Sequence, residues 1–149
     1  MPPIPPLTER LRDEIVELRE ISEWDIPEIL IAYQDDPTLH LRLAQRRPPT
    51  GAQLGSQVEM AEAKRSAGTA VSLTLVEPGG NDCRGRLDIS QINWERRSAQ
   101  LSIWVVPQLR GRRLANHALR LAKGWLRDNM GLTELSVTIA VDDDEPQGV

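Results

Sequence analysis

The stretch WVVPQLRGRRLANHALRLAKGWLRD, residues 104–128, predicts a strand, a tight basic loop and an amphipathic helix in direct succession. Pro107 ends the apolar run, and a single glycine, Gly111, lies among arginines. Apolar residues then recur at helical spacing, namely Leu114, Ala118, Leu121, Ala122 and Trp125. We therefore predict a helix over residues 112–128, with the arginines that repeat every seven positions on its outer face.

The turn into this helix has the chemistry of an anion site. The first backbone N–H groups of a helix have no partner within the helix and lie at the positive end of its dipole. Gly111 allows a ligand to approach the backbone closely, while Arg110, Arg112 and Arg113 add positive charge. We predict that this loop holds a phosphate group; the alternative is a solvated basic helix start.

The whole chain reads as one globular domain. Its 149 residues are 40% hydrophobic and 27% charged, and no apolar run reaches the about 18 residues that a membrane-spanning helix needs. The net charge of −4 argues against a nucleic-acid-binding protein. Cys83 is the only cysteine, which excludes an intrachain disulfide and fits a reducing cytoplasm. We expect a flexible lead over residues 1–7, a folded domain over 8–141 and an acidic tail over 142–149.

Periodicity places the other elements. Residues 14–21 alternate like a strand with one exposed face, and Ser22 with Asp25 resembles a capping box at the start of a helix over 23–34. Thr50 is expected to cap a second helix that reaches residue 67. Four further runs alternate as strands, namely 69–77, 84–92, 98–106 and 132–141. The first three of these runs are expected to form antiparallel strands. Together with the helices they give an α/β (α+β) fold.

This pattern resembles the GNAT N-acetyltransferase superfamily, and most closely its ribosomal-protein alanine acetyltransferases. The resemblance lies in RRSAQLSIWVVPQLRGRRLANHALRLAKGWLRDNMGL, residues 96–132, and in LREISEWDIPEIL, residues 18–30. The family loop follows the pattern Arg/Gln-x-x-Gly-x-Gly/Ala, which Arg110 matches at its first position and Ala115 at its last. The resemblance implies a mixed, mostly antiparallel sheet flanked by helices, C-terminally short, over roughly residues 8–141.

The resemblance further implies acetyl-CoA as a cosubstrate and a primary amine as the acceptor, either a protein N-terminus or a small amine. The loop would cradle the pyrophosphate, and the pantetheine arm would pair with backbone between two splayed strands. The implied CoA-binding residues are Val105, Val106, Arg110, Gly111, Arg112, Arg113, Leu114 and Ala115. The alternative is a catalytically impaired acyl-CoA-binding or protein-interaction domain.

Two departures from the family pattern concern the chemistry. Arg113 replaces the middle glycine of the loop; we expect it to be helical, with its guanidinium free to reach a phosphate, rather than strained at positive φ. Gln100 stands where many members of this branch have Glu, and an amide cannot act as a base. Asp88 and Glu95 are the other weak candidates for proton transfer, although both fit ordinary solvated carboxylates.

A third departure concerns the end of the chain, VDDDEPQGV. The resembled family continues past its last strand with a further helix and two strands. The last strand here would then be a bare edge, which predicts a homodimer or completion by another chain.

Overall fold

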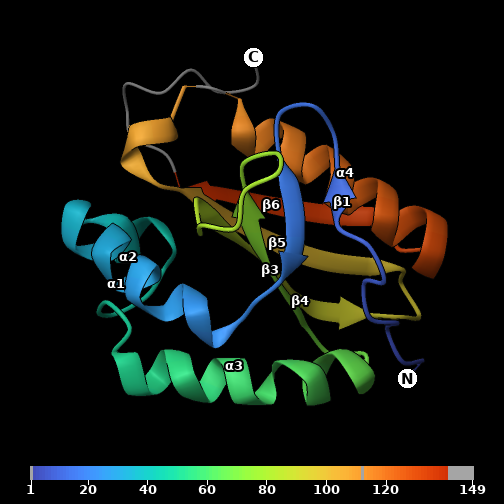
Figure 1. Cartoon of the computed structure of the whole chain (residues 1–149). Helices are drawn as coiled ribbons and strands as arrows, with labels where there is room; N and C mark the ends of the chain where they lie inside the picture. Colours follow the sequence, from blue (N-terminus) through green and yellow to red (C-terminus); the bar gives the residue numbers. More distant parts are fainter. Residues whose placement is uncertain (1, 112, 141–149) are drawn as a thin grey trace.

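Six strands form one sheet whose spatial order follows the chain, β1 to β6 (Figure 1). The strands are β1 (Leu11–Arg12), β2 (Glu17–Glu20), β3 (Val71–Val76), β4 (Gly85–Asn93), β5 (Ser98–Val105) and β6 (Glu134–Ala140). Neighbours are antiparallel except β5 and β6, which are parallel and are joined through a helix. The computed structural model describes residues 2–111 and 113–140. The predicted mixed, mostly antiparallel sheet is confirmed.

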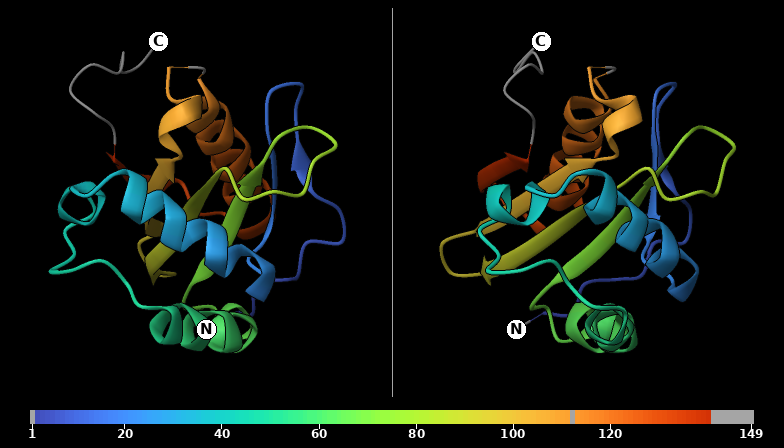
Figure 2. Two further views of the ribbon diagram at one scale, coloured as in Figure 1. Left: turned by 60° about the vertical axis from the view of Figure 1, so that its left-hand side comes forward. Right: turned by 90° about the vertical axis from the view of Figure 1, so that its left-hand side faces the viewer.

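Helices cover both faces of this sheet (Figure 2). They are η1 (Glu23–Asp25), α1 (Ile26–Asp35), α2 (Leu39–Arg42), α3 (Gly51–Ser66), η2 (Pro107–Leu109) and α4 (Leu114–Met130). The α4 helix packs on one face, where its buried residues join those of β2 to β5 in the larger core. Helices α1 to α3 lie on the other face around a smaller core that includes Tyr33 and Trp104.

Both predicted helix starts on the second face are confirmed by their caps. Ser22 and Asp25 form a capping box ahead of η1, and Thr50 and Gln53 form one ahead of α3. Leu54 is the only buried hydrophobic residue of α3. The two-residue strand β1 and the four-residue helix α2 are too short to leave a periodic signal. They were not predicted.

The first residues of the chain do not fit the predicted flexible lead. Ile4 is 1% exposed and belongs to the larger core. Its N–H donates to the Arg65 carbonyl at 3.1 Å, and its carbonyl accepts from the Arg65 guanidinium at 2.7 Å. The same guanidinium donates to Glu20 at 2.8 Å, so it ties the segment before β1 to both α3 and β2. The acidic tail, residues 142–149, lies outside the described residues.

A buried ion pair fixes η1 against the sheet. The Asp25 carboxylate accepts two hydrogen bonds from Arg19, at 2.7 and 3.0 Å, and one from the Thr74 hydroxyl at 2.7 Å. Burial alone would raise the pKa of Asp25, but these donors and the Ser22 N–H lower it below its usual value. The Asp25 carboxylate therefore has a structural role, because its hydrogen bonds are already made within the fold.

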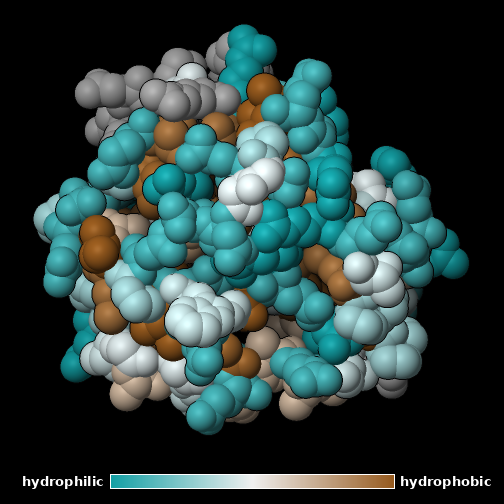
Figure 3. Space-filling model, viewed as in Figure 1, coloured by the Kyte–Doolittle hydropathy of each residue, from teal (hydrophilic) through white to brown (hydrophobic). Residues whose placement is uncertain are grey.

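Exposed apolar side chains are few. The face seen in Figure 3 is mainly hydrophilic, with separate apolar patches. Four large apolar side chains of the described residues are exposed, namely Trp24, Ile31, Leu41 and Met60. Trp24 is the most exposed of them, at 77%. Strand β6 lies at the edge of the described sheet, as expected; a second chain that pairs with it stays a prediction.

The single cysteine is expected to be chemically inert in the folded protein. Cys83 is 2% exposed, and burial raises the pKa of its thiol to about 12. Because the thiolate is the reactive form, a disulfide reagent such as DTNB should react with Cys83 only as fast as the protein opens. Following thionitrobenzoate release with and without denaturant checks this; fast labelling in native buffer would contradict the buried position.

Candidate functional site

The end of β5 and the turn into α4 form the first part of the candidate site. The last described pair between β5 and β6 is Trp104 opposite Ala140, and β5 itself ends at Val105. After η2 the chain passes through Gly111, with φ of 79°, and Arg113, with φ of 64°. Two left-handed residues thus flank position 112 immediately ahead of α4. Arg112, also a predicted site residue, lies outside the described residues.

Arg113 occupies the left-handed region, so the expectation that it is already helical is wrong. Its φ of 64° and ψ of 14° place it outside α4, at the N-cap. A left-handed conformation costs a residue with a side chain about 1–2 kcal/mol relative to glycine. The family's glycine at this position therefore reflects backbone geometry, which the chain keeps despite the arginine. The Arg113 side chain itself is exposed.

The start of α4 presents backbone N–H groups without a cap. Within the described residues, no side chain makes a cap hydrogen bond at Arg113. Among the described residues, the His117 N–H donates to the Arg113 carbonyl at 3.1 Å, and the N–H groups of Leu114 and Ala115 precede this helical bond. The N–H groups and the positive dipole end at such a helix start are suited to an anion.

Arg110 makes contacts that its place in the sequence did not predict. Its side chain is 7% exposed, and its Nε donates to the Val105 carbonyl at 2.9 Å. Its terminal nitrogen donates to Asp36, at the end of α1, at 2.6 Å. Arg42 of α2 donates to the same carboxylate. Arg110 therefore connects the loop to α1 and α2, and its contact with a ligand phosphate stays a prediction.

The electrostatics of Asp36 follow from these partners. Burial alone would raise the pKa of its carboxyl, but the hydrogen bonds from Arg110 and Arg42, with their charges, lower that pKa below the usual value. The carboxylate is thus held ionised between two guanidinium groups. Its side chain is 8% exposed, so little water screens these contacts.

The orientation of the backbone at the end of β5 decides which of Val105 and Val106 can pair with a pantetheine arm. The Val106 N–H donates to the Arg84 carbonyl at 2.9 Å, on the β4 side of the strand. Because the backbone groups of successive residues in a strand face opposite sides, those of Val105 face the β6 side. Only Val105 therefore faces the side where a pantetheine arm was predicted to pair. Its carbonyl already accepts the Arg110 hydrogen bond.

The second part of the candidate site is a cavity of about 320 Å³ on the face covered by α1 to α3. We call it the inner cavity. Its sheet side is lined by Ser72, Arg86, Asp88, Ser90, Ser102 and Trp104. Tyr33 of α1 also lines it, with its ring edge-on to Trp104 at 6.0 Å and its hydroxyl donating to Gln45 at 3.0 Å. Burial raises the pKa of Tyr33, which keeps it protonated at neutral pH.

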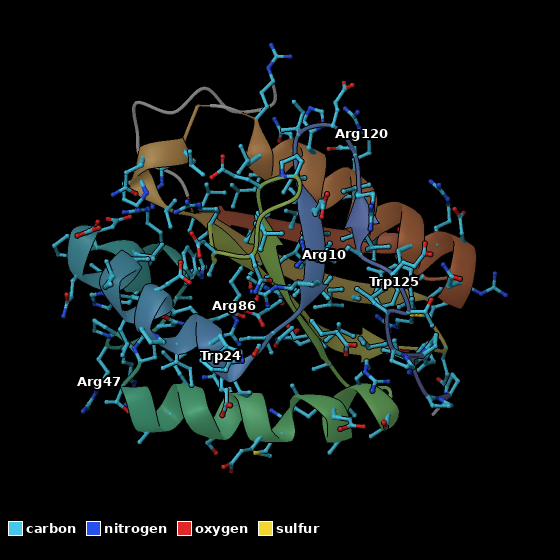
Figure 4. The ribbon with its side chains drawn as sticks, in the orientation of Figure 1. Arg10, Trp24, Arg47, Arg86, Arg120 and Trp125 are labelled. Carbon is cyan, nitrogen blue, oxygen red and sulfur yellow. The ribbon has the colours of Figure 1, made fainter. Side chains whose placement is uncertain are left out.

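Asp88 is the one proton-transfer candidate that lines the inner cavity. Its carboxylate accepts from the Ser72 hydroxyl at 2.7 Å and from Arg86 Nε at 2.9 Å. Arg86 points into the middle of the molecule (Figure 4), with its side chain 10% exposed. Asp88 is 33% exposed, and a carboxylate has about four acceptor positions, so it can also accept a hydrogen bond from a ligand ammonium.

The other candidates lie elsewhere. Gln100 lines a separate shallow recess with Ser98 and Ser136, and Glu95 is exposed in the turn between β4 and β5. His117, on α4, contacts Asp13 at 2.8 Å. This contact lies on the other face of the sheet from the inner cavity. Tyr33 was missed as a site residue because its helical spacing marked it only as core. Its status as the chain's single tyrosine was the one available signal.

Other kinds of site are absent from the part of the chain that the structure describes. It holds no group of three or more histidine, cysteine, aspartate or glutamate side chains arranged to bind a metal ion. None of its helices has the length and apolar character needed to span a bilayer.

Comparison with protein families gives one match. The acetyltransferase (GNAT) domain family matches residues 16–149, which is most of the chain. No curated protein sequence matches.

Solved structures of acetyltransferases share the fold. A putative ribosomal-protein-serine acetyltransferase from Vibrio cholerae superposes with a TM-score of 0.71 at 15% identity, covering 92% of this chain and 75% of its own. A spermidine N-acetyltransferase from Vibrio cholerae, solved with CoA and spermine, gives 0.69 at 15% identity, covering 84% and 71%. The ribosomal-protein-S5-alanine acetyltransferase from Vibrio fischeri gives 0.69 at 13% identity, covering 83% and 70%.

Proposed function

We propose a function from one premise: this chain belongs to the GNAT acetyltransferase family. The proposed reaction is transfer of an acetyl group from acetyl-CoA to a primary amine by direct attack. One observation carries the proposal, namely the two left-handed residues, Gly111 and Arg113, that lead directly into the N-terminus of α4. The family's loop pattern falls on the same positions.

The described residues fit a pyrophosphate in this loop. A Cβ added at Gly111 would meet no atom of the described residues within 4 Å, which leaves room among them for a ligand in front of this backbone. The N–H groups at Leu114 and Ala115 and the exposed guanidinium of Arg113 would contact the phosphates. We include Val105 for the pantetheine arm and Arg112 as predicted from sequence. Arg110 is assigned to holding the loop in place.

The chemistry requires little of the protein beyond positioning. The neutral amine nitrogen attacks the thioester carbonyl carbon and the C–N bond forms. The C–S bond then breaks, and the excess proton on the nitrogen passes to the departing CoA thiolate, which leaves as the thiol. Holding both substrates in the right geometry removes much of the entropic barrier. Asp88 would accept a hydrogen bond from the acceptor ammonium in the inner cavity, and the proton would then leave to solvent. We assign no other residue to the proton transfer.

This arrangement favours an α-amine as the acceptor. An α-amino group has a pKa of about 7.7–8.0, so about a third of it is neutral at pH 7.5, whereas a lysine amine with a pKa of about 10.4 is neutral in about one molecule in a thousand. Without a dedicated base, the α-amine therefore reacts far more readily. A protein or peptide N-terminus is the acceptor class that this reasoning supports.

The function can be tested with acetyl-CoA and short peptides. We expect acetylation at the α-amine, with kcat/KM rising from pH 6 and levelling near the α-amine pKa of about 8. Asp88→Asn should raise the peptide KM about 10-fold, since it removes a charged hydrogen-bond acceptor worth about 1.5 kcal/mol. Mass spectrometry locates the acetyl group. Glu95→Gln, at the exposed turn, is the matched control and should change neither constant.

A specific observation favours a second candidate, an acyl-CoA-binding domain without catalysis. Gln100 cannot act as a base, and the Val105 carbonyl is already engaged by Arg110. In that case calorimetry would show acetyl-CoA binding while no peptide or small amine became acetylated. Failure of both binding and turnover would remove both candidates.

A further inference from the structure

We infer that the acceptor is a peptide whose N-terminal amine is followed by acidic residues. The inference rests on the proposed function and on a second recess of about 380 Å³ beside the inner cavity. We call it the basic recess. Three side chains line both spaces, namely Gln45, Gln57 and Lys64. The two spaces therefore adjoin each other, and together they extend from Asp88 to the residues of the loop before α3 and of the α3 helix. We call the pair the groove.

The charge of the basic recess is of one sign. Arg46, Arg47 and Lys64 line it, and no carboxylate does. Within the described ranges 2–111 and 113–140, none of these three cations forms an ion pair or a side-chain hydrogen bond. They are exposed, on a protein whose net charge is −4. Free cations gathered in a recess, on an otherwise acidic molecule, attract anionic groups locally.

The two ends of the groove differ in charge. Asp88 lies at the inner end beside the buried Arg86, while Arg47 projects at the margin of the molecule near the start of α3 (Figure 4). An ammonium group is therefore accommodated only near Asp88, and carboxylates are accommodated toward Arg46 and Arg47. A chain that carries its amine first and its acidic side chains afterwards matches this order of charges.

Another recess, which shares Ala61 and Ser72 with the inner cavity, does not suit such a chain. Its charged lining residues are Glu20, Glu62 and Arg65, and Arg65 already donates to Glu20 at 2.8 Å. Its remaining charge is negative, so it repels acidic residues. The charges thus give the bound peptide a single direction, outward through the basic recess.

The size and lining of the groove favour a peptide over other acidic ligands. Each space alone, at about 320 and 380 Å³, is comparable to a small-ligand pocket, so the pair accommodates several residues of an extended chain. Single-stranded nucleic acid usually needs exposed aromatic rings on which its bases stack. The rings in this groove, Tyr33 and Trp104, are 7% and 3% exposed and packed against each other.

The experiment compares three peptides with one N-terminal residue, serine, followed by acidic, neutral amide or basic residues. Binding is measured by fluorescence anisotropy in the presence of CoA, and turnover is measured separately with acetyl-CoA. We expect the acidic peptide to bind about 10-fold more tightly than the neutral one at low salt. The preference should fall to about 2-fold near 0.5 M salt, because these charges are exposed.

Charge reversal distinguishes recognition from a structural role. The double variant Arg46→Glu/Arg47→Glu should prefer the basic peptide, while circular dichroism and acetyl-CoA affinity stay unchanged. Arg120→Glu, on the exposed outer face of α4, is the matched control and should keep the acidic preference. Preserved acidic preference in the double variant would overturn the inference.

The remaining outcomes separate this inference from the proposed function. Acidic-selective binding that the double variant reverses, without turnover, would leave the groove assignment standing and remove the acetyl transfer. Turnover with equal use of all three peptides, or no peptide binding, would remove the groove assignment. Tighter binding of a single-stranded oligonucleotide that competes with the acidic peptide would also overturn it, in favour of a nucleic-acid surface.

Discussion

Replacing Gly111 with glutamate is expected to weaken acetyl-CoA binding by about 100-fold or more. Gly111 has φ of 79° and faces open space, so its backbone lies at the mouth of the proposed phosphate loop. A glutamate there places a carboxylate against a pyrophosphate. At about 4 Å and an effective dielectric constant near 20, two like charges repel by about 4 kcal/mol, and every 1.4 kcal/mol is tenfold in affinity.

Gly79→Glu is the matched control. Gly79 also has a left-handed backbone, with φ of 75°, and also has nothing within 4 Å of an added Cβ, but it lies in the loop between β3 and β4. Both variants should lose about 1–2 kcal/mol of unfolding free energy through backbone strain. Calorimetric titration with CoA should show a loss only for Gly111→Glu. Unchanged affinity in that variant would mean that the phosphates lie elsewhere.

Removing the Asp36 carboxylate is expected to have the largest effect on stability. Asp36→Ala leaves Arg110 and Arg42 close together without the negative charge between them. Breaking a buried ion pair by removing one partner typically costs about 3–5 kcal/mol, and we expect about 3 kcal/mol here because Arg42 is partly exposed. Urea denaturation measures the change. Arg127→Ala, which removes an exposed pair with Asp128, should cost less than about 0.5 kcal/mol.

The pH dependence of this effect has a definite sign. The folded-state pKa of Asp36 is lowered, so its contribution is complete above the unfolded value of about 3.9 and is lost as pH falls through the folded value. The difference in unfolding free energy between wild type and Asp36→Ala should therefore be constant from pH 7 to 5. It should shrink below about pH 4. A difference under 1 kcal/mol at pH 7 would contradict the assignment.

The elements that could be predicted are those with a local signal. The apolar face of α4 and the two capping boxes depend on residues three or four positions apart in the sequence. The alternation of polar and apolar residues in β3 to β6 is equally local. The turn at Gly111 was predicted for the same reason. Strand β1 and helix α2, with two and four residues, are defined by tertiary contacts and not by a period.

The features that could not be predicted concern contacts between distant residues. Arg110 borders Gly111 in the sequence, which does not reveal that the fold brings Asp36, 74 positions earlier, to its guanidinium. Its role as a phosphate ligand stays a prediction. Ile4 was predicted to lie in a flexible lead, but the Arg65 guanidinium donates a hydrogen bond to its carbonyl. Asp88 could not be separated from Glu95 in the sequence, because only the sheet places one in a cavity and the other in water. A cytoplasmic location stays a prediction.

The agreement between strand order and chain order has a consequence for how the molecule forms during synthesis. Each strand from β2 to β5 pairs with a neighbour that has already emerged from the ribosome, so the sheet can grow from one side without waiting for later sequence. The parallel strand β6 requires α4 to cross over first. The turn between β5 and α4 is therefore among the last parts to acquire its shape, after the layer beneath it has formed.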